Sequence, residues 1–221
     1  MIRLNITAEG ASEAIFIEEM LRPHLLDFGK YIEVRKILTN RKQKVRGGMP
    51  SFSKIQQDIT QWIREQPTAW HTTMIDLYGL KTDFPAYVAT KDLRYDTRVK
   101  EIEKQFGEHI NYWRFIPYIQ LHEYEALLFS APDEMEKWLG LYNDVPEDYF
   151  TKIRAQFDTP EHINDSPHTA PSKRIVALIG EKKYDKVDDG ILILKEIGLT
   201  KIRQECPHFN AWLTQLENLV E

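Results

Sequence analysis

Five carboxylates in this chain follow stretches of apolar residues and could do chemistry together. Glu9 ends the alternating segment "RLNITAE", and Asp76 ends the apolar segment "HTTMID". Glu13 comes four residues after Glu9, and Glu123 and Glu125 follow the segment "RFIPYIQ". A carboxylate at the end of a buried strand is costly unless it is solvated, paired or bound to a cation. We therefore expect Glu9, Asp76 and Glu123 to hold a metal ion.

The residue types indicate which ion this would be. Two carboxylates about 4 Å apart repel each other by about 4 kcal/mol at an effective dielectric constant of about 20. Protonation of one carboxyl group or a bound cation removes that repulsion. Oxygen ligands without a cysteine cluster favour Mg²⁺ or Mn²⁺ over Zn²⁺. Such an ion can orient a phosphate group, activate water and stabilise a leaving oxygen.

The two remaining carboxylates are open to two interpretations. Glu13 and Glu125 would complete the ligand set or position water, which makes them catalytic candidates. Glu13 could instead complement the positive end of a helix dipole, and Glu125 could be a first-turn residue of a helix.

Two groups of cations could meet a phosphate. The first group lies at the end of the second predicted strand and in the loop after it, with no acid between its members: Arg35, Lys36, Arg41, Lys42, Lys44 and Arg46. It would contact the backbone of a nucleic acid or form a solvated loop. The second is Lys173, at the start of a predicted helix with Ser172 as its cap. Lys173 could stabilise charge on a phosphate or belong only to the helix start.

The elements that must position these residues alternate between strand-like and helix-like patterns. Apolar alternation predicts strands at 3–7, 31–38, 71–79 and 110–120. Helical periodicity predicts helices at 12–29, 51–66 and 91–107. We expect Ser12 to cap the first helix, Pro23 to kink or divide it, and Gly107 to end the third helix. This order predicts an α/β fold with a mostly parallel sheet of about four strands flanked by helices. Such sheets bind ligands at the carboxyl ends of their strands.

The pattern changes at about residue 131, where helical segments follow one another. They span 130–140, 147–157, 172–180, 189–198 and 206–220, and loops rich in Pro, Asp and Gly join them. We therefore expect an α/β metal-binding domain at 1–130 and a helical C-terminal extension at 131–221 that packs on it.

Composition narrows the possible classes. The 221 residues carry a formal net charge of −5, which argues against a general nucleic-acid coat protein but leaves room for a local basic patch. The lone Cys206 and the absence of a long apolar run indicate a cytoplasmic protein without a membrane span. No G-x-x-x-x-G-K-[ST] or G-x-G-x-x-G motif occurs, which argues against a P-loop ATPase and against dinucleotide binding.

Several short motifs resemble known families. "AEGASE" with "MIDLYG" resembles the Toprim domain, the metal-binding fold of topoisomerases, primases and several nucleases. The second acid, Glu13, four residues after Glu9, is similar to the pattern of the Toprim branch found in OLD nucleases. The chain also resembles a bacterial family called domain of unknown function four-two-seven-six. The shared motifs are EG-x-[ST]-E at 9–13, D-x-YG at 76–79, HE-x-EALLF at 122–129, APSKRI at 170–175 and CPHF-x-x-W at 206–212.

These resemblances imply a Toprim/Rossmann-like domain that acts as an Mg²⁺- or Mn²⁺-dependent nuclease on DNA or RNA, with a catalytic lysine at Lys173. They also imply a separate ATPase partner and a role in defence against phage. One position departs from the Toprim pattern, because Tyr78 stands where a second aspartate is expected. Glu123, Glu125 or Asp83 would supply the missing oxygen, or one metal would suffice. The alternatives are a subunit that binds nucleic acid or protein without cutting, and a small-molecule phosphoesterase.

Overall fold

The computed structural model describes residues 1–37, 49–164, 168–180 and 184–220. They form two compact units. Unit 1 comprises Met1–Ile119 and Leu216–Glu221, and unit 2 comprises Gln120–Gln215. The boundary between the two compact units lies after residue 119, and the last residues of the chain belong to unit 1. The domain boundary expected at residue 130 stays a prediction.

A parallel sheet forms the centre of unit 1, as the sequence predicts. Its strands are β1 (Ile2–Ala8), β2 (Lys30–Lys36), β3 (Trp70–Asp76) and β4 (Phe115–Ile116), in the order β2-β1-β3-β4. All neighbouring pairs are parallel, and β5 (Ile119–Gln120) also pairs with β3. Ala8 lies opposite both Lys36 and Met74, so the carboxyl ends of three strands meet at one edge.

The fourth predicted strand is much shorter than expected. Pro117 divides it into β4 and β5, because proline has no N–H to donate to a strand ladder. Beyond Pro117, the Thr73 hydroxyl forms hydrogen bonds with the backbone of Tyr118 in place of a strand ladder. Its Oγ1 donates to the Tyr118 carbonyl oxygen (2.8 Å) and accepts from the Tyr118 N–H (3.0 Å).

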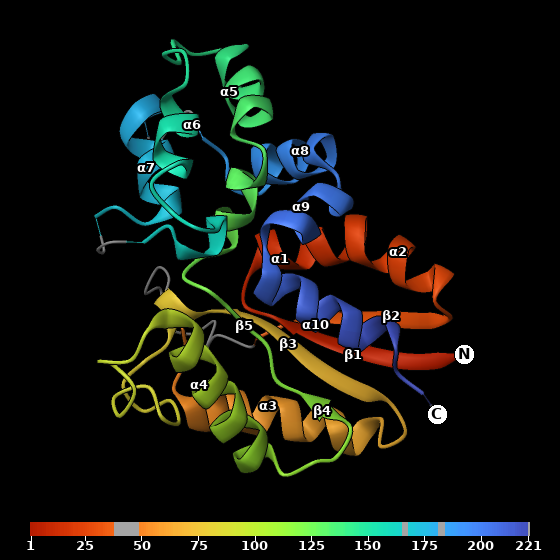
Figure 1. Ribbon diagram of the computed structural model, residues 1–221. Coiled ribbons are helices and arrows are strands. Elements are labelled where there is room, and N and C mark those ends of the chain that lie inside the picture. Colours follow the sequence, from red (N-terminus) through yellow and green to blue (C-terminus); the bar gives the residue numbers. More distant parts are fainter. Residues whose placement is uncertain (38–48, 165–167, 181–183, 221) are drawn as a thin grey trace, which may run out of the picture. The chain divides into compact units, whose positions relative to one another are not determined.

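The helices of unit 1 flank the sheet. Figure 1 shows α1 (Ala11–Phe16) and α2 (Arg22–Asp27) on one face, and α3 (Phe52–Glu65) and α4 (Tyr95–Ile110) on the other. The predicted stripe on α3 is confirmed: Ile55, Ile59, Trp62 and Ile63 are all buried.

Two predicted helix boundaries need correction. The helix after β1 is capped at Gly10 rather than Ser12, and it divides at a π-helical turn (Ile17–Leu21) that places Pro23 in the first turn of α2. Gly107 does not end α4. The helix continues to Ile110 and ends at Asn111, whose φ of 50° is left-handed. Gly107 instead faces Pro117, since a Cβ there would lie 3.5 Å from the proline Cγ.

Unit 2 is helical, as predicted for this part of the chain. It contains α5 (Pro132–Gly140), α6 (Tyr149–Arg154), α7 (Pro171–Ile179), α8 (Asp188–Ile197), α9 (Leu199–Glu205) and most of α10 (Pro207–Glu217). The sequence prediction missed α9. Two 3₁₀ helices, at Tyr124–Ser130 and Pro160–His162, complete the unit.

The segment 124–130 forms the core of unit 2. Every residue of this 3₁₀ helix is buried, including Glu125, and Phe129 packs edge-to-face on Phe150 of α6 at a centroid distance of 5.7 Å. The residues of the motif HE-x-EALLF are therefore part of the core of unit 2.

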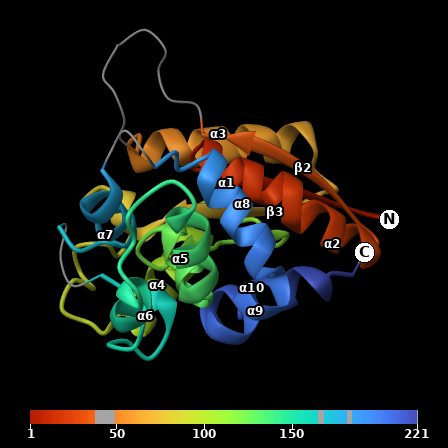
Figure 2. The same ribbon diagram turned by 90° about the horizontal axis from the view of Figure 1, so that it is seen from above.

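The two chain ends described in unit 1 lie close together, and Figures 1 and 2 show this from two directions. Two hydrogen bonds attach the last residues to the sheet: the Lys30 Nζ donates to the Leu219 carbonyl oxygen (2.6 Å), and the Trp70 Nε1 donates to that of Val220 (3.1 Å). Throughout the described ranges, no helix has the length and apolar character needed to cross a membrane.

Candidate active site at the carboxyl ends of the strands

Glu9 and Asp76 lie at the ends of two adjacent strands. The backbone N–H of Glu9 donates to the Met74 carbonyl oxygen (3.0 Å), so β1 and β3 stay paired for one residue beyond β1. The Glu9 carboxylate in turn accepts a hydrogen bond on Oε2 from the backbone N–H of Asp76 (2.9 Å). The Glu9 carboxylate thus lies against the backbone at the end of β3, and the sharing of one metal ion by Glu9 and Asp76 stays a prediction.

Two glycines make room for the carboxylates at this edge. A Cβ on Gly79 would lie only 2.9 Å from Oε1 of Glu9, so the turn after β3 can pass this close only with glycine there. A Cβ on Gly10 would lie 3.1 Å from Oε2 of Glu13. The short distances between these two glycines and the carboxylates give a physical reason for the glycine in each of the motifs EG-x-[ST]-E and D-x-YG.

Glu13 has a clear structural role. Its Oε2 accepts a hydrogen bond from the Gly10 N–H (2.8 Å), and the residue is only 6% exposed. This contact satisfies a backbone donor at the start of α1, as in the second half of a capping box. The carboxylate is therefore held at the Gly10 N–H whether or not it takes part in chemistry.

Tyr78, which replaces the expected aspartate, belongs to the 3₁₀ turn Leu77–Gly79 and is 41% exposed. Asp83 was one candidate for the missing oxygen. Its Oδ2 accepts from the backbone N–H of Phe52, the first residue of α3, at 3.0 Å. The capping of α3 accounts for Asp83.

Glu123 connects two motifs of unit 2. It is 6% exposed, and its Oε2 accepts from the backbone N–H of Ser172 at 3.0 Å. The predicted cap of α7 is corrected by this contact: the helix begins at Pro171 with Ala170 as N-cap, and Glu123 satisfies the N–H of Ser172. Lys173, the next residue, is exposed.

Glu125 is more deeply buried, with 3% exposure, and its Oε1 lies 2.7 Å from the Lys186 Nζ. Burial raises the pKa of Glu125 above its ordinary value. The charge of Lys186 lowers this pKa, and that of Glu123 raises it. The buried Tyr184 lies in the same surroundings, and its phenol pKa is raised mainly by burial and then by Glu125.

His122 begins this segment with strained backbone geometry. Its φ of 60° lies in the left-handed region, which is uncommon for a residue other than glycine. Its Nδ1 lies 3.0 Å from the Nδ2 of Asn164, so it forms a local hydrogen bond.

The sequence analysis missed one buried carboxylate, Glu161. It is 1% exposed, and its two oxygens accept the backbone N–H groups of His208 and Phe209, each at 2.9 Å, at the start of α10. Burial raises the pKa of Glu161. This contact, together with the buried Cys206 whose Sγ lies 3.3 Å from the Ser130 Oγ, explains the CPHF motif in structural terms.

The predicted basic cluster is described only at its start. Arg35 pairs with Glu65 (2.7 Å) and lies 4.5 Å above the centroid of the Trp62 ring, whereas Lys36 is exposed at the carboxyl end of β2. The other four cations lie outside the described residues: Arg41, Lys42, Lys44 and Arg46.

The candidate catalytic residues divide between the units. Glu9, Glu13 and Asp76 belong to unit 1; Glu123, Glu125 and Lys173 belong to unit 2. In the part of the chain that the structure describes, no group of three or more His, Cys, Asp or Glu side chains is arranged to hold a metal ion. Glu9 and Asp76 alone still fit Mg²⁺, which proteins often bind through one or two carboxylates while water and substrate phosphates fill the other positions.

Fold and site define an α/β protein with acidic residues at the carboxyl ends of adjacent parallel strands. The chain belongs to the family described as "Domain of unknown function (DUF4276)", whose profile matches residues 8–217. No protein with a curated description matches it.

Two solved structures resemble the chain over nearly its whole length. One is the C-terminal region of the OLD protein of Burkholderia pseudomallei, with 14% identity, a TM-score of 0.49 and coverage of 99% of this chain and 98% of that one. The other is the corresponding region of the Xanthomonas campestris pv. campestris OLD protein, with 13% identity, a TM-score of 0.40 and coverage of 97% of both chains.

Proposed function

We propose that this chain is a phosphodiesterase that uses Mg²⁺ or Mn²⁺ and acts on DNA or RNA, with unit 1 as a Toprim-like metal-binding domain. The observation that carries the proposal is the hydrogen bond from the Asp76 N–H to the Glu9 carboxylate. It brings the Glu9 carboxylate to the backbone of Asp76, at the edge where parallel sheets bind ligands. The turn after β3 approaches this carboxylate closely, since a Cβ on Gly79 would lie 2.9 Å from Oε1 of Glu9.

The side chains take separate roles in this proposal. Glu9 and Asp76 hold the ion, which when bound would activate water and stabilise a leaving oxygen. Glu13, fixed by the Gly10 N–H, orients a water molecule. The roles that the sequence predicts for three residues of unit 2 stay predictions: Glu123 as a metal ligand, and Glu125 and Lys173 as catalytic groups.

The nucleic-acid part of the proposal depends on cations at the same edge. Lys36 is exposed and lies opposite Ala8, one residue before Glu9. A phosphate bound there would be a short distance along the edge from the acids. In line with the resemblance to OLD nucleases, we further propose that the protein works with a separate ATPase, as a nuclease component in defence against phage.

A second function is favoured by the capping contacts. Glu13, Asp83 and Glu123 each accept a backbone N–H at the start of a helix, and Tyr78 replaces an expected acid. These contacts would suit a domain that binds a nucleic acid or a protein without cutting it.

Cleavage assays separate these functions. Single-stranded and double-stranded DNA, RNA and a small phosphodiester are incubated with the protein and Mg²⁺ or Mn²⁺, with chelator as the blank. We expect cleavage of a polymer by wild type and no cleavage above the blank by Glu9→Gln or Asp76→Asn. Glu108→Gln, an exposed carboxylate on α4, is the matched control and should retain full activity.

Three other results would contradict the proposal. Polymer binding without cleavage by wild type would favour the binding subunit. Turnover of the small phosphodiester alone would favour a small-molecule phosphoesterase. Cleavage that Glu9→Gln leaves unchanged would place the chemistry elsewhere.

A further inference from the structure

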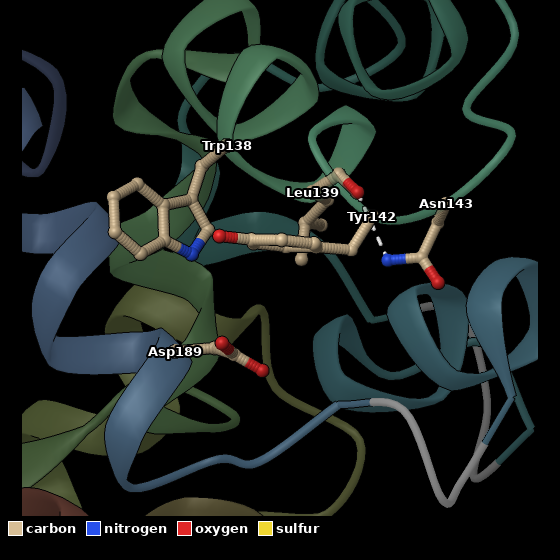
Figure 3. A pocket seen from close by; sticks show the side chains of 5 residues that line it. All are labelled: Trp138, Leu139, Tyr142, Asn143 and Asp189. Atoms are coloured by element: carbon tan, nitrogen blue, oxygen red, sulfur yellow. Dashed lines mark hydrogen bonds between the residues drawn. The ribbon is translucent and has the colours of Figure 1, made fainter.

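A hollow of about 290 Å³ lies in unit 2. It is lined by Trp138 and Leu139 of α5, Tyr142 and Asn143 of the following loop, and Asp189 of α8. Figure 3 shows the aromatic side chains of Trp138 and Tyr142 along one side of it and the carboxylate of Asp189 opposite them.

The polar atoms of this hollow mostly accept hydrogen bonds. Asp189 uses Oδ2 to accept the Asp185 N–H (2.9 Å), and its carboxylate has a second oxygen to offer. The Asn143 Nδ2 donates to the Leu139 carbonyl oxygen (2.9 Å), a contact drawn in Figure 3, which fixes the orientation of the amide. The Oδ1 of Asn143 is buried and has no hydrogen-bond partner among the described residues. The Asp189 carboxylate and the Asn143 Oδ1 are acceptors that a hydrogen-bond donor on a ligand would match.

The aromatic residues add a preference for a flat cation. Tyr142 is 84% exposed, so a face of its ring is open to a ligand. Aromatic faces carry partial negative charge and attract cations, and a guanidinium group can stack on them while its edge donates to a carboxylate. The combination of a ring face with an acceptor carboxylate thus matches arginine better than lysine.

The charged residues around the hollow also favour a cationic ligand. The loop 141–148 contains three acids and no base, and Asp185 and Asp188 flank Asp189. The described cations beside the hollow are engaged: Lys137 pairs with Glu134 (3.4 Å), and Lys186 pairs with Glu125 (2.7 Å). Such a surface attracts a cation and repels a phosphate.

We propose that this hollow binds the side chain of an arginine on a partner protein. The guanidinium group stacks on Tyr142 and donates to Asp189. Leu141, 61% exposed beside Tyr142, contacts the apolar neighbours of that arginine, which a free small molecule would lack. This inference does not depend on the proposed phosphodiesterase activity.

The test uses the full chain and three blocked tripeptides, Leu-Arg-Leu, Leu-Lys-Leu and Leu-citrulline-Leu, titrated while the Trp138 indole N–H is followed by NMR. Citrulline has the shape of arginine without its charge. We expect saturable binding in the millimolar range for the arginine peptide and about tenfold weaker binding for citrulline, as the loss of one favourable ion pair implies. The lysine peptide should bind with intermediate affinity.

Two variants make the result specific. Asp189→Asn keeps an oxygen for the Asp185 N–H and should weaken arginine binding about tenfold. Tyr142→Ala changes an exposed side chain, so folding is preserved, and should weaken binding several-fold. Equal binding of arginine and citrulline peptides, or binding unaffected by both variants, would overturn the proposal. So would a guanosine nucleotide that binds in the hollow more tightly than the arginine peptide, because the ligand would then be a base.

Discussion

Glu123 and Ser172 lie 49 positions apart in the chain and are joined by one hydrogen bond of 3.0 Å, from the Ser172 backbone N–H to the Glu123 carboxylate. Both are buried, so the bond links the HE-x-EALLF and APSKRI motifs inside unit 2. The same carboxylate is a proposed metal ligand. Stability and activity measurements can separate these two roles.

Replacement of Glu123 tests the capping role directly. Glu123→Ala leaves a buried N–H of α7 unsatisfied and should lower the free energy of unfolding by about 1–3 kcal/mol. Glu123→Gln keeps an oxygen acceptor and should cost clearly less. Urea denaturation of both variants gives the comparison. If only the capping role is real, Glu123→Gln retains full cleavage activity; if Glu123 also binds metal, that variant is stable but inactive.

Gly79 should control the position of the Glu9 carboxylate. Gly79→Ala places a Cβ 2.9 Å from Oε1 and 3.4 Å from Oε2, so the Glu9 carboxylate has to shift from its present position. We expect weaker Mn²⁺ binding, measured by calorimetry, together with reduced cleavage. Gly140→Ala is the matched control, since no atom lies within 4 Å of its added Cβ. Equal Mn²⁺ affinities in the two variants would contradict a metal role for Glu9.

The raised pKa of Glu125 should make stability depend on pH. In the folded chain this carboxyl group keeps its proton at pH values where the unfolded chain has lost it, so the folded state binds more protons in that window. Its contribution is fully present below the ordinary glutamate pKa and is lost as pH rises to the folded value. The difference in urea midpoint between wild type and Glu125→Gln should therefore change as pH rises through this window. The comparison isolates Glu125, because Glu161, whose pKa is also raised, is present in both proteins. A pH-independent difference would contradict the prediction.

Lys36 should contribute to nucleic-acid affinity more than Arg35 does. The Arg35 guanidinium is already engaged by Glu65 and the Trp62 ring, whereas Lys36 is exposed at the edge that carries Glu9. Lys36→Ala should reduce the slope of log affinity against log salt concentration by about one, with a smaller effect for Arg35→Ala. Filter binding at several salt concentrations measures both slopes. Lys104→Ala, on α4, is the control. Unchanged binding with Lys36→Ala would remove this residue from the interface.

The fold was largely predictable where local patterns act alone. The alternation of β1, the apolar run of β3 and the stripe of α3 each reflect burial of one face or of a whole strand, so the sequence carries them directly. The prediction failed where tertiary contacts override local signals. Gly107 indicates a helix end, yet α4 continues to Ile110 with Gly107 facing Pro117, and Pro117 itself divides the predicted fourth strand.

The site was predictable in part for the same reason. Parallel strands bring their carboxyl ends together, so the proximity of Glu9 and Asp76 follows from the order of elements. The helix-capping roles of Asp83, Glu123 and Glu161 could not be predicted, because each depends on a partner between 31 and 49 positions away. A short motif shows that an acid is present and leaves open whether its partner is a cation or an N–H group.

The attachment of the chain's last residues to the first strands affects how fragments of this protein would behave. Lys30 is 5% exposed, and the carbonyl oxygen of Leu219 accepts its ammonium group. A polypeptide truncated after residue 130 would lose this acceptor, and with it a hydrogen bond to a charged group that contributes about 1–3 kcal/mol. For expression or crystallisation, the N-terminal half should carry residues 216–220, fused through a linker or added as a synthetic peptide.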